Sequence, residues 1–292
     1  MPSIIDPIPL VDPVRRFVLF TNAKCGGTTL KSWFFANLDL PALERRPWRF
    51  LATYGPGQAL RHLRRGRKAV PRGAALRDAE AVRRMTNYYR HAYCQPLIEA
   101  GGILDFFKLA VVRHPEDRVV SGFVDKICGE DRREPWVREV VAAAGGEGRV
   151  TFASFLDYLE RTPDEICDPH WRRQTHILEG HRIDAFVRLE ALAADFAAVA
   201  ARVGSEHLDV FARRLQSNPY DPALAAAALA ADMPARGQAE VIAWRETHGA
   251  FPPKEAFLTP ETRGRIRRIY AKDFALLPYG DADSASVTAT SG

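Results

Sequence analysis

The 292-residue sequence has few cysteines, and none of them are close together. Cys25, Cys94, Cys128 and Cys167 form no Cys-x-x-Cys pair, which excludes a zinc ribbon and a redox dithiol. No stretch approaches about 18 consecutive apolar residues, so we expect no membrane span. The first 13 residues hold four prolines and two aspartates instead of a basic segment followed by an apolar run, so we expect no signal peptide. The sequence therefore predicts a cytoplasmic protein with reduced thiols.

Acidic residues are scarce between residues 41 and 90. This window holds twelve arginines and Lys68 against three acidic residues, a net charge of +10, whereas the whole chain carries +5. Basic surface of this strength indicates an anionic ligand or partner, and a solvated arginine-rich face is the alternative.

Secondary structure is indicated by apolar runs, caps and turn residues. Buried strands are expected at 17–20, 107–112 and 184–189. Helices are expected at 28–37, 79–100, 115–128, 152–160, 191–203 and 260–274. Strands that alternate with helices predict an α/β fold with a mainly parallel central sheet flanked by helices. We expect one domain over residues 1–280, with the basic 41–90 segment as an insertion, and a disordered tail over 281–292.

Glycines and hydroxyl side chains gather between the first expected strand and the first expected helix. Two adjacent glycines let the backbone approach an anion and point its N–H groups toward it. The helix N-terminus, two threonine hydroxyls and a lysine add positive potential and donors. The motif predicts a phosphate- or sulfate-binding loop made of Lys24, Cys25, Gly26, Gly27, Thr28, Thr29 and Leu30.

Other loops of this kind fit the residues less well. A tight strand-to-helix turn would explain Gly26 and Gly27 but not the lysine or the paired threonines. A Walker-type loop places its lysine after the last glycine, whereas Lys24 precedes both. A cysteine phosphatase would need an arginine six positions after Cys25, where the chain has Lys31.

A second group of anion-binding side chains follows the second expected strand. Arg113 would lie at the end of that strand, where its planar guanidinium can clamp a phosphate. Ser121 comes eight residues later, two turns along the next helix, and its hydroxyl can reach the same phosphate. Arg118 either joins them or fixes the loop by ion pairing. Two such segments at neighbouring strand ends match the edge where open α/β sheets bind nucleotides.

Together the two segments resemble those of the sulfotransferases that use 3′-phosphoadenosine 5′-phosphosulfate. Residues 24–30 are similar to the family's 5′-phosphosulfate loop, and residues 113–121 to its 3′-phosphate segment. The details are closest to the carbohydrate branch, including the chondroitin, dermatan and HNK-1 enzymes, in a soluble, bacterial-like form. Further similarities follow in order at residues 112–126, 151–158, 168–174, 186–195 and 270–279.

The resemblance implies a P-loop-like nucleotide-binding core and O-sulfotransferase activity without a metal. A sulfuryl group would pass to an acceptor hydroxyl on a carbohydrate or glycoconjugate, or alternatively on a lipid or small natural product. Lys24 would neutralise the bridging oxygen of the departing phosphate. No nucleic-acid partner is implied, and the oligomeric state stays open.

The acceptor hydroxyl also needs a general base. The resemblance places such a base upstream of the 3′-phosphate segment, which favours His91, with His170 as the second candidate; a purely structural histidine is the alternative for each. Trp171 would either stack on a sugar or be buried. Two other function classes remain: a metal-dependent small-molecule kinase, whose acidic ligands are not apparent, and a non-catalytic binder of an anionic polymer through residues 41–90.

Overall fold

A computed structural model describes most of the chain. The chain forms two compact units, each made of segments that alternate along the sequence. The residues that the structure describes are 8–38, 46–48, 51–52, 54–57, 78–129, 133–204 and 220–280. We call residues 6–112 and 177–216 the sheet unit, and residues 1–5, 113–176 and 217–292 the helical unit. Much of the basic 41–90 segment and the whole 281–292 tail lie outside the described residues, and the single domain over 1–280 stays a prediction.

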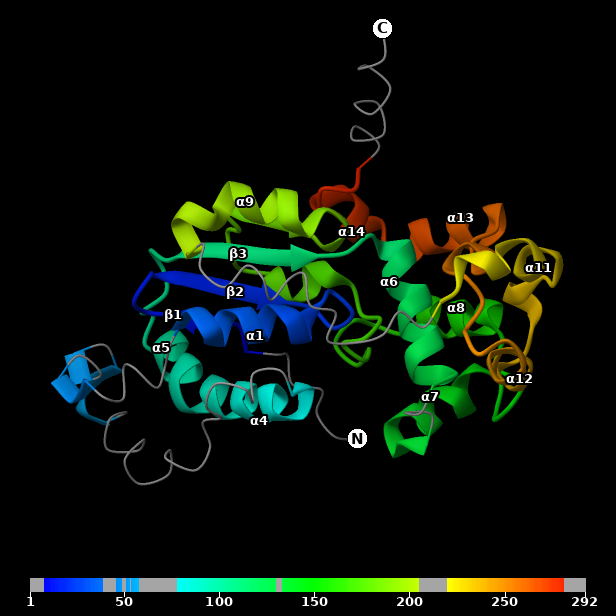
Figure 1. The fold of residues 1–292 in the computed structure, drawn as a ribbon, viewed down its shortest axis with the longest axis horizontal. Helices are drawn as coiled ribbons and strands as arrows, with labels where there is room; N and C mark the ends of the chain where they lie inside the picture. The colour runs from blue at the N-terminus through cyan, green and yellow to red at the C-terminus, as the bar shows by residue number, and fades with distance from the viewer. Residues whose placement is uncertain are drawn as a thin grey trace, which may run out of the picture. The chain divides into compact units, whose positions relative to one another are not determined.

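A four-stranded, mostly parallel sheet forms the centre of the sheet unit (Figure 1). In order across the sheet, its strands are β1 (Leu10–Asp12), β2 (Phe17–Thr21), β3 (Phe107–Val112) and β4 (Ala185–Arg188). β2, β3 and β4 are parallel, as predicted, and the short antiparallel β1 was not predicted. The register pairs Thr21 with Val111 and Val112 with Arg188, so the three parallel strands end at one edge.

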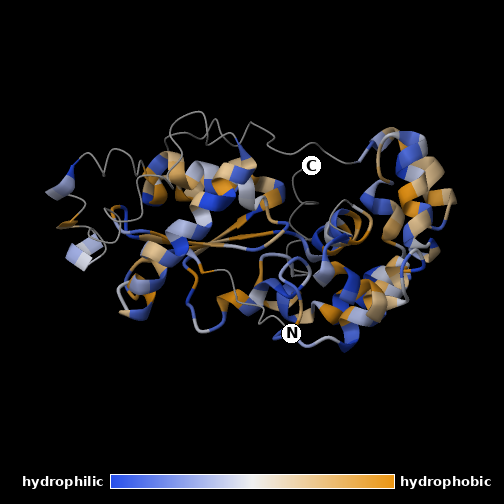
Figure 2. Ribbon diagram, turned by 90° about the horizontal axis from the view of Figure 1, so that it is seen from below, coloured by the Kyte–Doolittle hydropathy of each residue, from blue (hydrophilic) through white to orange (hydrophobic). Residues whose placement is uncertain are grey.

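The sheet unit also contains helices and helical turns, some of which contribute aromatic side chains to its core. They are α1 (Gly27–Leu38), α4 (Ala79–Tyr89), the π-helical η3 (Arg90–Cys94), α5 (Gln95–Glu99), the 3₁₀ turn η7 (Leu189–Ala191) and α9 (Leu192–Val203). Trp33 of α1 contacts Phe17 of β2 and Phe196 of α9, with ring centroids 6.2 and 4.6 Å apart. The central strands are almost wholly apolar (Figure 2), because both of their faces are covered.

The helical unit consists of short helices around a second core. They are α6 (Pro115–Gly122), the π-helical η4 (Phe123–Ile127), α7 (Pro135–Ala144), α8 (Phe152–Arg161), η8 (Pro222–Leu224), α11 (Ala225–Ala230), η9 (Met233–Ala235), α12 (Gln238–His248), η10 (Lys254–Phe257), α13 (Pro260–Ile269) and α14 (Ala271–Leu276). The chain passes back to the sheet unit within η6 (Gln174–Leu178). Phe123, Phe152, Phe155 and Phe257 are buried together at the centre.

Two helix boundaries bear on the sequence predictions. Thr151 caps α8 as expected, since its hydroxyl accepts from Ser154 N at 3.0 Å. The single helix expected over 260–274 is wrong: the chain leaves helical geometry at Tyr270 and continues as α14. The break lets Tyr270 and Asp273 both point into the core, where each is almost fully buried. None of the helices in the described part of the chain has the length and apolar character to cross a membrane.

Candidate functional site

The loop between β2 and α1, which the sequence predicts to bind an anion, has an unusual backbone. Lys24 and Gly26 both have a left-handed backbone, with φ of 65° and 69°. Such a conformation is unusual for lysine, and strain of this kind gathers at functional sites. α1 begins at Gly27, so its first N–H groups follow the loop directly. The predicted strand–loop–helix arrangement is therefore present.

The seven residues of the predicted loop divide by exposure. Cys25 and Leu30 are fully buried, so only their backbones can face a ligand. The other five residues are half-buried, which leaves the ammonium of Lys24 and the hydroxyls of Thr28 and Thr29 within reach of solvent. The loop can thus offer backbone N–H groups, two hydroxyls and one full positive charge.

Gly26 is required at its position for two independent reasons. Its left-handed backbone disfavours any residue with a Cβ. A Cβ built on it would also lie 2.7 Å from Cδ1 of Leu189, the first residue of η7. Leu189 therefore packs directly against the loop at Gly26.

We expect Gly26→Ala to lower the free energy of unfolding by about 1–3 kcal/mol, through left-handed strain and the clash with Leu189. Because the loop must move, binding of adenosine 3′,5′-bisphosphate should weaken as well. Gly180→Ala is the matched control in the same unit: φ is 74°, but nothing lies within 4 Å of the added Cβ. Urea unfolding and calorimetric titration measure the two effects. If both variants bind the bisphosphate like the wild type, the loop does not contact it.

In the helical unit, Arg113 is fixed by a buried glutamine. The side-chain Oε1 of Gln174 accepts from Arg113 N at 2.9 Å, and its Nε2 donates to Arg113 O at 2.7 Å. Gln174 is itself held by Asp273, which accepts from Gln174 N at 2.8 Å and from Thr175 N at 2.9 Å. Gln174 and Asp273 have no exposed surface. This chain of hydrogen bonds fixes the backbone from which the Arg113 guanidinium projects.

We expect Gln174→Ala to weaken the binding of adenosine 3′,5′-bisphosphate roughly tenfold, because two hydrogen bonds that position Arg113 are lost. Gln174→Glu should be at least as harmful, since it places a carboxylate oxygen against the carbonyl of Arg113. Gln95→Ala removes a half-buried glutamine of α5 and serves as the control. Calorimetric titration measures the dissociation constant of the bisphosphate. A wild-type value in Gln174→Ala would show that Arg113 does not need these two hydrogen bonds.

The second predicted phosphate ligand, Ser121, lies near Arg113. Ser121 hydrogen-bonds the hydroxyl of Tyr220, and the charge of Arg113 acts on the same tyrosine. Burial raises the pKa of Tyr220, so its hydroxyl stays a hydrogen-bond donor at neutral pH. Tyr220 was not predicted as a site residue, because a single tyrosine far along the chain carries no motif. The structure thus brings Arg113, Ser121 and Tyr220 together.

The turn formed by residues 168–171 packs against α6 next to Ser121. A Cβ built on Gly122 would lie 3.2 Å from His170 O. Buried Arg118 donates to Pro169 O and to Arg172 O, each at 2.6 Å. Arg118 thus fixes this turn through backbone carbonyls, and the ion pair expected for it stays a prediction.

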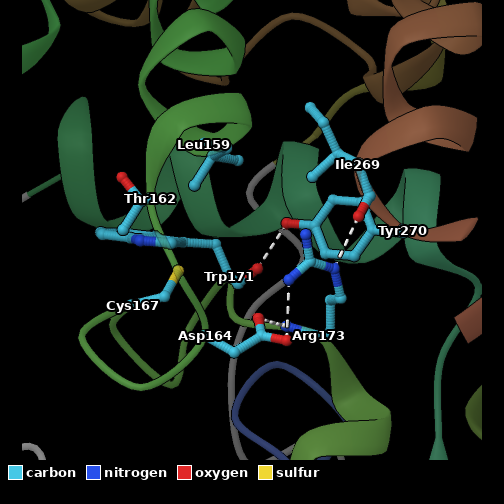
Figure 3. A pocket seen from close by; sticks show the side chains of 8 residues that line it. All are labelled: Leu159, Thr162, Asp164, Cys167, Trp171, Arg173, Ile269 and Tyr270. Carbon is cyan, nitrogen blue, oxygen red and sulfur yellow. Dashed lines mark hydrogen bonds and ion pairs between the residues drawn. The ribbon is translucent and has the colours of Figure 1, made fainter. Parts of the chain in front are cut away.

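Within this turn, His170 is oriented and Trp171 is buried. Asp168 Oδ1 accepts from His170 Nδ1 at 2.6 Å, and the ring stacks on Trp136 with centroids 5.5 Å apart. Trp171 is 1% exposed, so the expectation that it might stack on a sugar is wrong. Figure 3 shows its indole in a small pocket with Cys167, and its carbonyl accepting from the Tyr270 hydroxyl.

The family of the chain follows from a comparison with known proteins. The family model described as "Sulfotransferase family" matches residues 10–280, which include both predicted anion-binding segments, the 168–171 turn and Asp273. The chain belongs to the sulfotransferase family. Searches of curated proteins and of solved structures returned no match. The protein is therefore a transferase, and its mixed α/β fold with a mostly parallel sheet is consistent with the sulfotransferase fold.

His91 of this sulfotransferase lies in the sheet unit, in the π-helical η3. Its side chain is exposed, and its Nδ1 lies 3.2 Å from Oε1 of Gln95. The neighbouring Arg90 is the side chain that turns toward the sheet, where its Nη2 lies 3.5 Å from Thr21 Oγ1 at the end of β2. Of the two rings, that of His170 faces a carboxylate through Nδ1, whereas that of His91 faces an amide oxygen.

Among the described residues of the sulfotransferase, no three or more His, Cys, Asp or Glu side chains are placed to hold a metal ion. The acidic residues beside Arg113 have other partners. Glu116 pairs with Arg263, and Asp117 pairs with Lys254. The described site therefore presents mainly positive charge and hydrogen-bond donors.

Proposed function

We propose that this sulfotransferase moves a sulfuryl group from 3′-phosphoadenosine 5′-phosphosulfate to a hydroxyl of a carbohydrate or glycoconjugate in the cytoplasm. The observation that carries the proposal is the pair of anion-binding segments after β2 and β3. The first is a strained, lysine-bearing loop at the start of α1, and the second is an arginine held by buried Gln174. Parallel strands end together at the edge where α/β sheets bind nucleotides.

In this proposal the two segments bind the two ends of one nucleotide. The loop formed by residues 24–30 takes the 5′-phosphosulfate through its backbone N–H groups and threonine hydroxyls. Arg113 and Ser121 take the 3′-phosphate, where a planar guanidinium can form two parallel hydrogen bonds. Tyr220 supports this assignment, because its hydroxyl bonds Ser121 and lies within the field of Arg113.

Transfer then needs charge stabilisation on one side of sulfur and a base on the other. The acceptor oxygen bonds to sulfur as the sulfur–oxygen bond to the 5′-phosphate breaks, and adenosine 3′,5′-bisphosphate leaves. Negative charge grows on the bridging oxygen, and the ammonium of Lys24 stabilises it. The acceptor's proton passes to a histidine.

We propose His170 as that base, ahead of His91. A carboxylate can only accept, so Asp168 fixes the proton on Nδ1 of His170 and leaves Nε2 free to receive another. Trp136 holds the ring plane. His91 Nδ1 lies instead beside the amide oxygen of half-buried Gln95. His91 remains the alternative, and the two are separated by mutation below.

Transfer of label from donor to acceptor tests the proposed function. Purified protein with EDTA and ³⁵S-labelled donor would be offered oligosaccharides, glycolipids and small phenols or alcohols in parallel. Label should pass to a carbohydrate acceptor without added metal. Label on lipid or natural-product acceptors alone would overturn the carbohydrate assignment, and phosphate transfer from ATP with Mg²⁺ instead would overturn sulfuryl transfer.

A further inference from the structure

Two cations meet beside the loop without being part of either motif. Lys31 lies in the second turn of α1, and its side chain runs back over the first turn: a Cβ built on Gly27 would lie 3.7 Å from Lys31 Nζ. Arg90 begins the π-helical η3 and reaches Thr21, the last residue of β2. All of these residues belong to the sheet unit. Both side chains therefore converge where the loop leaves the sheet.

The two cations are close enough to repel and are shielded from water. Burial is the main cause that lowers the pKa of Lys31 to about 8, and the charge of Arg90 lowers it further. Burial likewise lowers the pKa of Arg90 to about 10. Bringing like charges together out of water is unfavourable unless an anion joins them.

No acid in the described part of the chain compensates this charge. Neither Lys31 nor Arg90 forms an ion pair with any residue the structure describes. Nε of Arg90 is buried and has no hydrogen-bond partner there. Single turns of π-helix such as η3 are frequent at functional sites, because they redirect a side chain at the expense of helical geometry. Here the redirected side chain is a buried, under-bonded arginine.

We propose that Lys31 and Arg90, with the hydroxyl of Thr21, form a subsite for a tetrahedral oxyanion, the sulfonate end of the donor's phosphosulfate. The inference rests on the proposed function for the identity of the donor. At the 5′ end the donor carries two anionic groups, and the loop with Lys24 accounts for the phosphate. The sulfonate is the remaining anion, and this pair of cations lies next to the loop. An acidic group on the acceptor is the other possible source of an oxyanion.

Calorimetric titration of charge-removing variants tests this subsite. Lys31→Met and Arg90→Met keep an unbranched apolar stem, and loss of a buried like-charge pair should not impair folding. Arg84→Met, which removes an exposed arginine from α4, is the control. Each protein would be titrated with the phosphosulfate donor, with adenosine 3′,5′-bisphosphate and with sodium sulfate.

We expect both variants to lose much more affinity for the phosphosulfate donor than for the bisphosphate. Donor affinity should fall about 10–100-fold in each variant, because a charge-assisted hydrogen bond to the sulfonate is lost, whereas bisphosphate affinity changes less than about threefold. Sulfate should bind the wild-type bisphosphate complex but not the donor complex, where the sulfonate already occupies the subsite. Equal losses for both nucleotides, or none, would overturn the proposal.

Two further outcomes would show that the sulfonate assignment, or the proposed function itself, is wrong. If sulfate still binds the donor complex and Lys31→Met abolishes that binding, the oxyanion comes from the acceptor and the sulfonate assignment is wrong. If the wild type binds neither nucleotide, the proposed function fails. The subsite is then judged by sulfate alone: loss of sulfate binding in Lys31→Met supports an oxyanion site, and unchanged binding refutes it.

Discussion

Lys24→Ala is expected to lower turnover by about 10²–10³, because the ammonium meets charge that develops only as the phosphate departs. Binding of adenosine 3′,5′-bisphosphate should fall much less, since other groups of the loop hold the ground state. Steady-state rates with labelled donor and calorimetry with the bisphosphate measure the two quantities. A variant that loses affinity and turnover in equal proportion would place Lys24 in ground-state binding instead.

The left-handed backbone of Lys24 supplies a matched control. Glycine adopts φ near 65° without strain, whereas alanine retains the strain of the lysine. Lys24→Gly should therefore be more stable than Lys24→Ala by roughly 0.5–1 kcal/mol, after the greater chain entropy of glycine is counted. Both should be equally slow. If Lys24→Gly is the less stable of the two, the loop is not strained at this residue.

His170→Ala should lower turnover by roughly 10²–10⁴, the usual contribution of a positioned base, with donor binding intact. Asp168→Asn should lower it less, because the asparagine still contacts Nδ1 but no longer fixes the tautomer needed for proton acceptance. His91→Ala should stay within about threefold of the wild type, since its ring is exposed and bonded only to Gln95 among the groups the structure assigns to it. Turnover numbers at saturating donor compare the three variants.

The opposite pattern of turnover losses would favour His91 over His170 as the general base, as the sequence alone did. A loss of tenfold or more in His91→Ala, with His170→Ala near the wild type, makes His91 the base. If neither histidine variant slows turnover tenfold, the base is a group other than these two, and the Asp168–His170 pair only holds the turn.

The parts of the site that were predictable are continuous in sequence. The loop at 24–30 joins a short apolar strand to a helix, so its geometry follows from local chemistry: two glycines, a lysine and a helix start. Arg113 and Ser121 belong to one continuous segment: Arg113 directly follows β3, and Ser121 lies in α6, which begins two residues after Arg113. The three parallel strands were predicted for the same reason, because each is a buried apolar run with turn residues after it.

The parts that were not predictable depend on residues distant in sequence. Gln174 and Arg113 are 61 positions apart, and Asp273 and Gln174 are 99 apart. A single glutamine or aspartate carries no periodic signal, so only the folded chain shows that they position Arg113. Lys31 and Arg90 converge for the same reason, through a π-helical turn that no pattern indicates. β1 has only three residues, too few for a period, and α12 lies where the apolar spacing is weak.

The most direct test of the account is a metal-free calorimetric titration with adenosine 3′,5′-bisphosphate, in wild type and in Arg113→Ala. The account predicts tight binding by the wild type in EDTA and a loss of about tenfold or more in Arg113→Ala, because a guanidinium–phosphate contact disappears. A thermal shift should follow, with stabilisation of about 2.7 kcal/mol at a hundredfold excess over the dissociation constant. Equal affinity in the two proteins, or binding of ATP with Mg²⁺ in place of the bisphosphate, would contradict it.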